Sequence, residues 1–344
     1  MHIFTTSCID TRFARAALLL ANLHLIPFQS PVYNTITSTL VPLSIPLLLF
    51  DSNISRIISS TGSLLKAFFV GTFSTLLATV ISYRLVPMRQ LKHESWAVAS
   101  ALASRHIGGA INFVAVAETF NISPQTVAAA IAADNVVVAL YFIFLFAIAK
   151  SGADDVVNAD DAAIPPATAL TLESLSLSLT ISSILVFLGK QLTSRIMPSF
   201  SALPFISLLT VLGATALPRV FEPLATSASV LGVIFVQLFF ATAGAGGSIA
   251  AVISTSPTLF AFSALQIALH FAFLMAGGRA LKLPYRELFL ASNANVGGPT
   301  TAAAMAKGKK WDKLVLPALM VGIAGYAFGT LAGVGLGLSV LSKM

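Results

Sequence analysis

The sequence has little of what a secreted domain or a soluble enzyme would need. It contains a single cysteine, Cys8, among 344 residues, so no disulfide can form within the chain. Only 10% of the residues are charged, against about 25% in an average soluble domain, whereas 56% are hydrophobic. A surface with so few charges would not keep a chain of this length dispersed in water. The two shortages exclude a disulfide scaffold and indicate that the solvent of this chain is the lipid bilayer.

The motifs of the common enzyme classes are also missing. His93-Glu94 lacks the second histidine of a zinc-protease HExxH, and no GxSxG, phosphate-binding loop or Cys/His cluster with metal-ligand spacing occurs. Ser104 and His106 are two residues apart and would not face each other on a helix, so a serine hydrolase is a poor fit. We therefore expect no catalytic residues, no metal and no cofactor.

Basic residues outnumber acidic ones, 20 to 13, which gives a net charge of +7. In a soluble protein this excess would suggest nucleic acid as a partner. Here the lysines and arginines lie between apolar runs, where they would face lipid headgroups. We expect the lipid bilayer, and no nucleic acid, among the partners.

Hydrophobic runs that could cross a membrane occur throughout the chain. A membrane-spanning helix needs about 20 apolar residues. Such runs lie at 31–50, 63–82, 127–149, 174–189, 200–217, 228–250, 256–278 and 314–341. Two further apolar segments, 95–120 and 285–306, are each interrupted by a pair of glycines. These elements predict an all-α, polytopic transmembrane helical bundle, that is, a multi-pass integral membrane protein.

A polar stretch divides the chain into two halves of similar length. Residues 151–169 contain four aspartates followed by Pro165-Pro166, a composition typical of a solvated acidic linker. We predict an N-terminal repeat at 1–150, which would lack its first helix, and a C-terminal repeat at 170–344. The first fifteen residues carry Ser, Thr and Arg with one acid, which is a weak pattern for a transit peptide.

The two glycine-interrupted segments resemble each other. IGGAINFVAVAE at 107–118 and VGGPTTAAAMAK at 296–307 align without gaps, and both glycines and two alanines are identical. Each motif occupies the same position within its half. Internal repeats whose corresponding segments are interrupted by glycine point to the binding site of a secondary transporter. We expect the repeats to be inverted, with each interrupted segment forming a crossover or a re-entrant hairpin.

The glycine pairs allow a helix to break inside the membrane. A break frees backbone N–H and C=O groups, and only protein, ligand or water in a cavity can satisfy them there. The helix that starts after a break presents N–H groups to an anion, and the helix that ends before it presents carbonyls to a cation. Polar side chains cluster around both breaks. The predicted substrate-binding residues are Arg105, Gly108, Gly109, Asn112, Asn293, Asn295, Gly297, Gly298, Thr300 and Thr301. Close packing of helices through small residues is the alternative.

Ionisable residues within the apolar segments are few, and a charge at mid-membrane is a functional candidate by default. We predict that Asp134 and Asn135, with Glu118, couple transport to an ion. The alternatives are that Asp134 is a buried carboxylate paired with Arg105 or the backbone, and that Glu118 is a charge at the membrane rim. Gln266 and His270 share one helix face, which favours an interhelical hydrogen bond over ligand binding.

Four glycines recur every four residues near the end of the chain, from Gly325 to Gly337. Such a stripe predicts close packing against a neighbouring helix. The same kind of surface would permit a homodimer.

Four stretches together resemble the family called domain of unknown function 819, the YjcL-like membrane proteins. They are VPLSIPLLLF, IGGAINFVAVAE, AAAIAADNVVVALYF and the stretch from SNANVGGPTT to GIAGYAFGT. The resemblance covers the chain from about residue 20 onward; more distantly, the repeated half is similar to sodium-coupled glutamate, citrate and bile-acid symporters. It implies a transporter-like fold without naming a substrate. Plant relatives are expected in plastids, which makes the plastid envelope the expected location, and relatives usually begin with about one and a half more helices.

From these observations we predict a secondary transporter of a small organic anion, coupled to Na⁺ or H⁺. The alternative function is that of a non-transporting membrane scaffold or a truncated, inactive paralogue. An intramembrane enzyme is the third reading.

Overall fold

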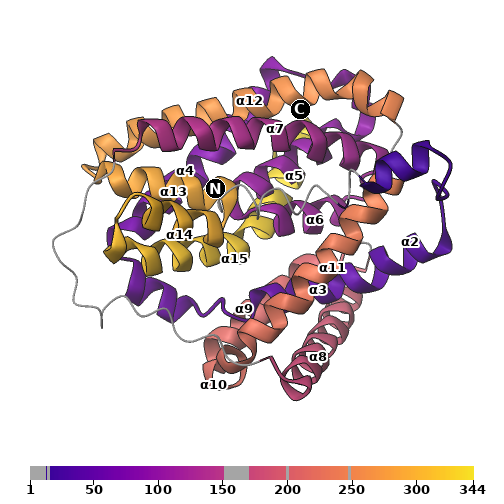
Figure 1. The fold of residues 1–344 in the computed structure, drawn as a ribbon, viewed down its shortest axis with the longest axis horizontal. Helices are drawn as coiled ribbons and strands as arrows, with labels where there is room; N and C mark the ends of the chain where they lie inside the picture. Colours follow the sequence, from indigo (N-terminus) through magenta and orange to yellow (C-terminus); the bar gives the residue numbers. More distant parts are fainter. Residues whose placement is uncertain (1–12, 14–15, 151–169, 199–200, 247–248) are drawn as a thin grey trace.

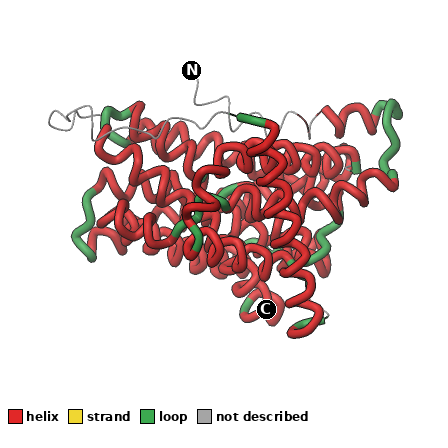
Figure 2. The backbone as a smooth tube through the Cα atoms, turned by 90° about the horizontal axis from the view of Figure 1, so that it is seen from below, coloured by secondary structure: helices red, strands yellow, loops and turns green. Residues whose placement is uncertain are grey.

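The computed structural model describes residue 13 and residues 16–150, 170–198, 201–246 and 249–344. All regular structure in these ranges is helical (Figure 2). In the first half the elements are α2 (Pro31–Thr35), the π-helix η1 (Ile36–Leu40), α3 (Val41–Leu49), α4 (Ile54–Leu85), η2 (Arg89–Glu94), α5 (Ser95–Gly108), α6 (Ala110–Thr119) and α7 (Pro124–Ile148). In the second half they are α8 (Leu172–Ile196), α9 (Leu203–Ala216), α10 (Pro218–Phe221), η4 (Glu222–Leu224), α11 (Ala225–Ala245), α12 (Ile249–Ala280), α13 (Tyr285–Gly297), α14 (Pro299–Gly308), η5 (Asp312–Leu314), α15 (Val315–Ser339) and η6 (Leu341–Lys343).

Seven helices in the described ranges are long and apolar enough to cross a membrane. They confirm a polytopic helical bundle and an integral, multi-pass membrane protein. The spans are Pro31–Leu49, Ile54–Leu85, Pro124–Ile148, Leu172–Ile196, Pro218–Ala245, Pro257–Ala280 and Asp312–Lys343. The span predicted at 200–217 is wrong in length, because α9 has only 14 residues. At 1.5 Å per residue it extends about 21 Å, less than the ~30 Å of a bilayer core. The linker predicted at 151–169, like Cys8, falls outside the described residues.

The helices form two groups (Figure 1). One group contains α4–α7 and α12–α15, in which α5 packs against α15, and α12 packs against both α4 and α7. The other contains α2, α3 and α8–α11, in which α3 packs against α8, α9 and α11. Fewer contacts join the two groups, chiefly those of α7 with α11 and of α9 with α15. We call them the eight-helix group and the outer group.

Both interrupted segments are broken helices with the same backbone geometry at the break. Between α5 and α6, Gly109 has φ 78° and ψ −172°, and between α13 and α14, Gly298 has φ 81° and ψ −169°. Each of these glycines donates its N–H to the carbonyl four residues earlier, at 2.7 and 2.9 Å. An L-residue rarely adopts such a backbone, so the second glycine of each pair is the one that the break requires.

The two halves also share other features of the backbone. Helices α4 and α12 both have 32 residues, and α7 and α15 both have 25. Lys92 and Lys282, which precede α5 and α13, both have positive φ. Asn121 and Lys310, in the turns after α6 and α14, do as well. The order of elements therefore recurs from α4–α7 to α12–α15, while the inverted orientation stays a prediction.

The glycine stripe of α15 lies against α5 within the same chain. A Cβ on Gly333 would come within 2.6 Å of the Ser104 Cβ, and one on Gly337 within 2.6 Å of the Ser100 Oγ. A Cβ on Gly108 would overlap the Gly325 carbonyl oxygen. The prediction of close packing is confirmed. Because α5 occupies the stripe, a homodimer would need another surface.

Candidate functional site

The two helix breaks lie next to each other in the eight-helix group. A Cβ placed on Gly109 would be 4.0 Å from the Cα of Gly298. The ring of Tyr326, from the middle of α15, is 3.5 Å from that Cβ position and 3.3 Å from the corresponding position on Gly298. The ring therefore packs across both breaks. Two segments that are far apart in the sequence form one site beneath a single aromatic side chain.

A cluster of charged and polar side chains lies directly before the first break. Arg105 Nε is 2.5 Å from Asp134 Oδ2, and His106 Nε2 is 2.8 Å from Asp134 Oδ1. Ser263 from α12 donates its hydroxyl to Asp134 Oδ1 at 2.5 Å, and Arg105 also donates to Asn135 Oδ1 at 2.6 Å. The side chains of His106 and Asp134 have no exposed surface. Arg105, Asp134 and Asn135 therefore act as one group with His106, which by its place before the first break was, like Arg105, a candidate to balance Asp134.

The protonation pattern of this cluster follows from its geometry. An ionised Asp134 can only accept hydrogen bonds, so the proton between it and His106 is on Nε2 of the imidazole. The Nδ1 atom of His106 is buried and has no hydrogen-bond partner among the described residues. The pairing of Asp134 with Arg105, the alternative role for this carboxylate, is present in the structure. A structural pair and a coupling site have the same contacts here, so the contact alone does not assign the role.

A second polar cluster surrounds His270 in α12. The Thr75 hydroxyl is 3.1 Å from the Gly71 carbonyl, 3.2 Å from the His106 carbonyl and 2.8 Å from His270 Nδ1. Carbonyl oxygens only accept, so the single Thr75 proton goes to them and Thr75 accepts from His270 Nδ1–H.

The other nitrogen of His270 continues this chain of hydrogen bonds. Neutral His270 has an Nε2 that must accept, and it lies 2.9 Å from Ser292 Oγ in α13. Ser292 then donates to His270 and accepts from the hydroxyl of Tyr141 in α7. The chain links α4, α12, α13 and α7. The interhelical hydrogen bond predicted for His270 is confirmed, as is one for Gln266, which donates to Thr79 at 2.6 Å.

The polar residues after the two breaks bind the freed backbone groups. Asn112 donates to the Gly108 carbonyl at 2.7 Å and to the Gly325 carbonyl at 3.3 Å, while accepting from Thr330. Thr301 donates to the Gly298 carbonyl at 3.1 Å. Thr300, at the start of α14, is exposed. Three of the predicted binding residues are thus at the breaks, and Asn112 and Thr301 satisfy carbonyls there.

The two asparagines before the second break point to different neighbours. Asn293 donates to the sulfur of Met305 at 3.4 Å, and Asn295 donates to Thr72 in α4 at 3.2 Å. The side-chain oxygens of both asparagines are buried and accept no hydrogen bond from the described residues. These two amide oxygens are strong acceptors, and they lie without a donor among the described residues just before the second break.

Known proteins are similar to this chain in sequence over nearly its whole length. The family model described as "Protein of unknown function (DUF819)" matches residues 13–344. The chain belongs to this family. It is 30% identical over 349 residues to the uncharacterized membrane protein YjcL of Bacillus subtilis (strain 168), an alignment that covers 93% of this chain and 87% of YjcL. The family resemblance stated from the motifs is confirmed, and neither comparison assigns a substrate.

In this DUF819 chain, Glu118 lies apart from Asp134. It lines a pocket of about 570 Å³ formed by residues 28–37, the turn from α6 to α7, and the end of α11. None of the residues that contact Asp134 lines this pocket. The structure therefore does not bring the three predicted ion-coupling residues together.

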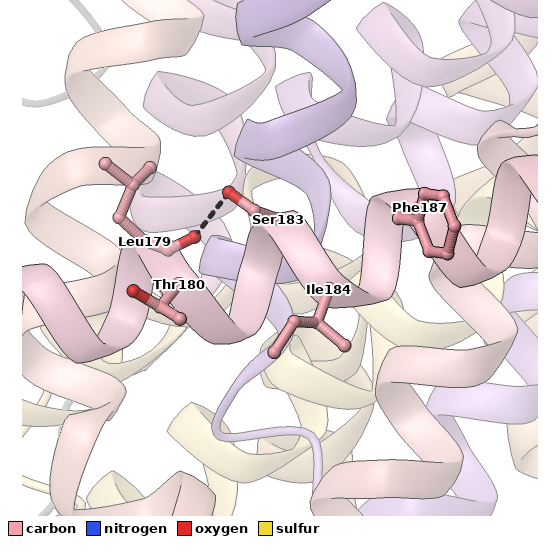
Figure 3. Close-up of a pocket in the computed structure, with 5 residues that line it drawn as sticks. All are labelled: Leu179, Thr180, Ser183, Ile184 and Phe187. Carbon is pink, nitrogen blue, oxygen red and sulfur yellow. Dashed lines mark hydrogen bonds between the residues drawn. The ribbon is translucent and has the colours of Figure 1, made fainter.

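A second pocket lies on the outer face of α8 and is formed by that helix alone (Figure 3). Its lining is mostly apolar, and the hydroxyl of Ser183 is bonded to the Leu179 carbonyl at 2.8 Å. Over an apolar 18-residue stretch of α8, only 22% is buried inside the protein. This helix face is suited to contact with lipid tails.

Several residues of the DUF819 site were not found from the sequence. They are Thr75, Tyr141, Ser263, Ser292 and Tyr326. Ser263 belongs to a polar stripe in an otherwise apolar helix, since Ser263, Gln266 and His270 recur at helical spacing, and this signal was available. Thr75, Ser292, Tyr141 and Tyr326 carry no comparable signal, because single hydroxyl residues are common in apolar helices and their partners come from distant segments.

Proposed function

We propose that this DUF819 protein is a secondary transporter of a small organic anion, coupled to H⁺ or Na⁺ through Asp134. The observation that carries the proposal is the pair of adjacent helix breaks beneath Tyr326. A break that costs backbone hydrogen bonds inside a membrane is expected where it serves a ligand. Two breaks with the same dihedral angles, side by side, supply two helix N-termini and two helix C-termini around one point.

The Arg105–Asp134 pair suggests how ion and anion are coupled. The Arg105 guanidinium lies 2.5 Å from Asp134, so the carboxylate compensates its positive charge. Arg105 therefore attracts a substrate anion less strongly than a free guanidinium would. A proton bound to Asp134 would release Arg105, and a Na⁺ ion beside the carboxylate would do so more weakly. Binding of the cation would then favour binding of the anion, and the reverse follows by linkage. In this proposal Arg105 binds the substrate anion only when the coupling ion is bound.

Unused hydrogen-bonding atoms next to the breaks and in the polar stripe of α12 also favour a ligand site. His106 Nδ1, Asn293 Oδ1, Asn295 Oδ1 and Gln266 Oε1 are buried without partners among the described residues. Native proteins leave few buried polar atoms unpaired, and such atoms call for water, an ion or a ligand. Packing of small residues alone would explain the glycines and leave these four atoms unexplained.

The division into two helix groups supplies a mechanism for alternating access. The breaks belong to the eight-helix group, and the contacts between this group and the outer group are fewer than those within each. Movement of one group against the other would expose the breaks to one side of the membrane at a time. Ion and anion need only bind the two arrangements with different affinity to drive the cycle.

The first experiment is a ligand screen on the purified, detergent-solubilised protein. Thermal unfolding is measured with mono-, di- and tricarboxylates and sulfonates, each in Na⁺ or choline buffer and at two pH values. A ligand that binds only the folded state stabilises it by about 2.7 kcal/mol at a hundred times its dissociation constant. We expect one anion class to raise the unfolding temperature, more strongly at low pH or in Na⁺.

The control variant removes both charges of the pair, as Asp134→Asn together with Arg105→Gln. This double variant should fold and should lose the dependence on pH or Na⁺. Ligands found in the screen are then tested for uptake into proteoliposomes. A folded wild-type protein that no anion stabilises, or a double variant that keeps the full ion-dependent shift, would contradict the proposal and favour a scaffold.

The remaining parts of the proposal concern setting and partners. We propose that the protein acts without a cofactor, as a transporter and not as an enzyme, in the plastid envelope. The location depends on the family resemblance alone and is tested by imaging the full chain fused to a fluorescent protein in plant cells.

A further inference from the structure

The pocket beside Glu118 is separate from the helix breaks. Its volume of about 570 Å³ lies within the range of small-molecule sites, roughly 300–1,000 Å³. It is formed where three parts of the chain meet, namely residues 28–37, residues 118–127 and the last turns of α11. All of them are at helix ends, and none of the residues that line the pocket belongs to the glycine breaks.

The charge of this pocket is unusual for a chain that is basic overall. Basic residues outnumber acidic ones, 20 to 13, yet the described residues that line the pocket include no Lys, Arg or His. Among these residues Glu118 carries the one carboxylate. Among the described residues no hydrogen bond or ion pair engages the Glu118 carboxylate. A partly buried carboxylate without a cationic partner is costly, and a cationic ligand would offset that cost.

The neighbouring acid shows that the chain can satisfy a carboxylate at this level of the fold. Glu94 accepts hydrogen bonds from the Ser123 N–H at 2.8 Å, from the Ser123 hydroxyl at 3.0 Å and from the Thr126 hydroxyl at 2.5 Å. It thereby caps the start of α7, where the helix dipole also favours negative charge. Glu118 has no such donors, so capping does not explain its presence.

The rest of the lining suits an organic cation better than a bare metal ion. Phe28, Tyr33 and Phe239 give the pocket three aromatic rings, and aromatic faces attract ammonium groups. Gln29 and Asn34 add neutral amide groups. No group of three His, Cys, Asp or Glu residues that could hold a metal ion occurs in the described part of the chain.

We propose that the pocket binds a small organic cation, with its ammonium group on the Glu118 carboxylate and its carbon skeleton against the aromatic side chains. The ammonium could belong to a free amine or to the headgroup of a phospholipid, which share this chemistry. The site does not depend on the transport proposal, because it shares no residue with the breaks or with the Asp134 cluster.

The test measures thermal unfolding of the full-length protein with choline, tetramethylammonium or putrescine, against NaCl at the same ionic strength. We expect at least one amine to raise the unfolding temperature more than NaCl does, and this difference to vanish in Glu118→Gln. Glu173→Gln is the matched control, since Glu173 is an exposed carboxylate at the start of α8 outside the pocket. That variant should respond like the wild type.

A second variant keeps the carboxylate and fills the pocket. Asn34 is exposed at the pocket, so Asn34→Arg, which adds both bulk and a positive charge there, should block amine binding even if Glu118→Gln fails to fold. Short-chain phosphatidylcholine and phosphatidylglycerol distinguish the sources, because a headgroup site would respond to the choline lipid more than to free choline. Equal stabilisation by amines and NaCl in the wild type, or amine shifts that survive in both Glu118→Gln and Asn34→Arg, would overturn the proposal.

Discussion

Asp134 and Arg105 are the residues whose substitution the structure constrains most. Asp134 has no exposed surface, and the side chain of Arg105 is 8% exposed. Removing one partner of a buried ion pair leaves the other charge uncompensated and costs about 3–5 kcal/mol. We therefore predict that Asp134→Asn alone lowers the free energy of unfolding by roughly this amount. Chemical unfolding in a mild detergent measures the effect.

The double variant tests the cause of that loss. With Arg105→Gln added to Asp134→Asn, no buried charge is left unpaired, and most of the lost stability should return. If the double variant is as unstable as the sum of the two single variants, the pair is not coupled as the distances indicate. A loss of transport in Asp134→Asn alone would not show a role in coupling, because misfolding would produce it too.

The sequence predicted the members of this site better than it predicted their partners. Arg105 and Asp134 stand out because ionisable groups in apolar helices are rare, and the structure joins them to each other and to Asn135. The pairing of Asp134 with Arg105 was only an alternative in the sequence analysis, and the contact in the structure shows that Arg105 is not a free anion ligand. Glu118 has the same signal as Asp134 but lines a different pocket, because it lies at the end of α6 whereas Arg105 and His106 of the cluster lie before that helix begins. Because charged residues are rare in apolar helices, they can be picked out from the sequence as candidate functional residues. Only the tertiary contacts show which of them lie in the same site.

Among the helices, the two breaks depend on single glycines. Gly109 and Gly298 have φ near +80°, which L side chains rarely adopt. A Cβ on Gly109 would be in ordinary contact with Tyr326 at 3.5 Å, whereas one on Gly298, at 3.3 Å, would push the Tyr326 ring slightly aside. The main cost of an alanine at either break is therefore backbone strain, about 1–3 kcal/mol each. We predict that Gly109→Ala and Gly298→Ala both lower stability, and that Gly298→Ala lowers it by at least as much as Gly109→Ala. Thermal unfolding of the two variants side by side checks this.

Gly335 in α15 provides the matched control. It is exposed, has ordinary helical φ and has open space where a Cβ would go. Gly335→Ala should stabilise the helix by about 0.5–1 kcal/mol, since alanine loses less conformational entropy than glycine. If alanine at either break proved as harmless as at Gly335, the breaks would not be built into the backbone as described.

The turn between α3 and α4 gives a pH dependence outside the membrane spans. Burial raises the pKa of Asp51 above its ordinary value of 3.8, Arg56 at 3.3 Å lowers it, and Glu222 adds to the rise. The folded state thus holds a proton on Asp51 at pH values where the unfolded chain has lost it. Stability therefore falls as the pH rises from 3.8 through the pKa of Asp51 in the folded state.

Substitution of Asp51 isolates this contribution. Asp51→Asn removes the titration, so the wild type should lose stability relative to the variant across that pH window and keep a constant difference above it. Unfolding temperatures of both proteins between pH 4 and neutrality, a range of about three units, provide the comparison. Parallel curves would show that Asp51 does not hold its proton more tightly in the folded state.

For the molecule as a whole, hydropathy predicted the helical bundle and most of the spans. It failed at 200–217, because a run of apolar residues does not show where a helix begins or ends, and α9 has only 14 residues. It also could not divide the helices into the eight-helix group and the outer group. That division depends on which helices pack together, as α5 does with α15 across most of the sequence. The pattern of apolar residues locates the helices in the sequence. Which helices pack together depends on complementary surfaces such as the glycine stripe, and the pattern does not show these.

The recurrence of elements in the two halves leads to the last prediction, which concerns orientation. Lys92 and Lys282 are exposed turn residues with positive φ, placed alike before α5 and α13. In a Cys8→Ser background, Lys92→Cys and Lys282→Cys are labelled, one at a time, with a membrane-impermeant thiol reagent. Inverted repeats place the two positions on opposite sides of the membrane, so sealed vesicles of one orientation should react at only one of them. Asn121→Cys and Lys310→Cys, in the turns after α6 and α14, should again differ from each other. Reaction of both members of a pair from the same side would make the halves parallel repeats, and the rocking mechanism would then lose its symmetry argument.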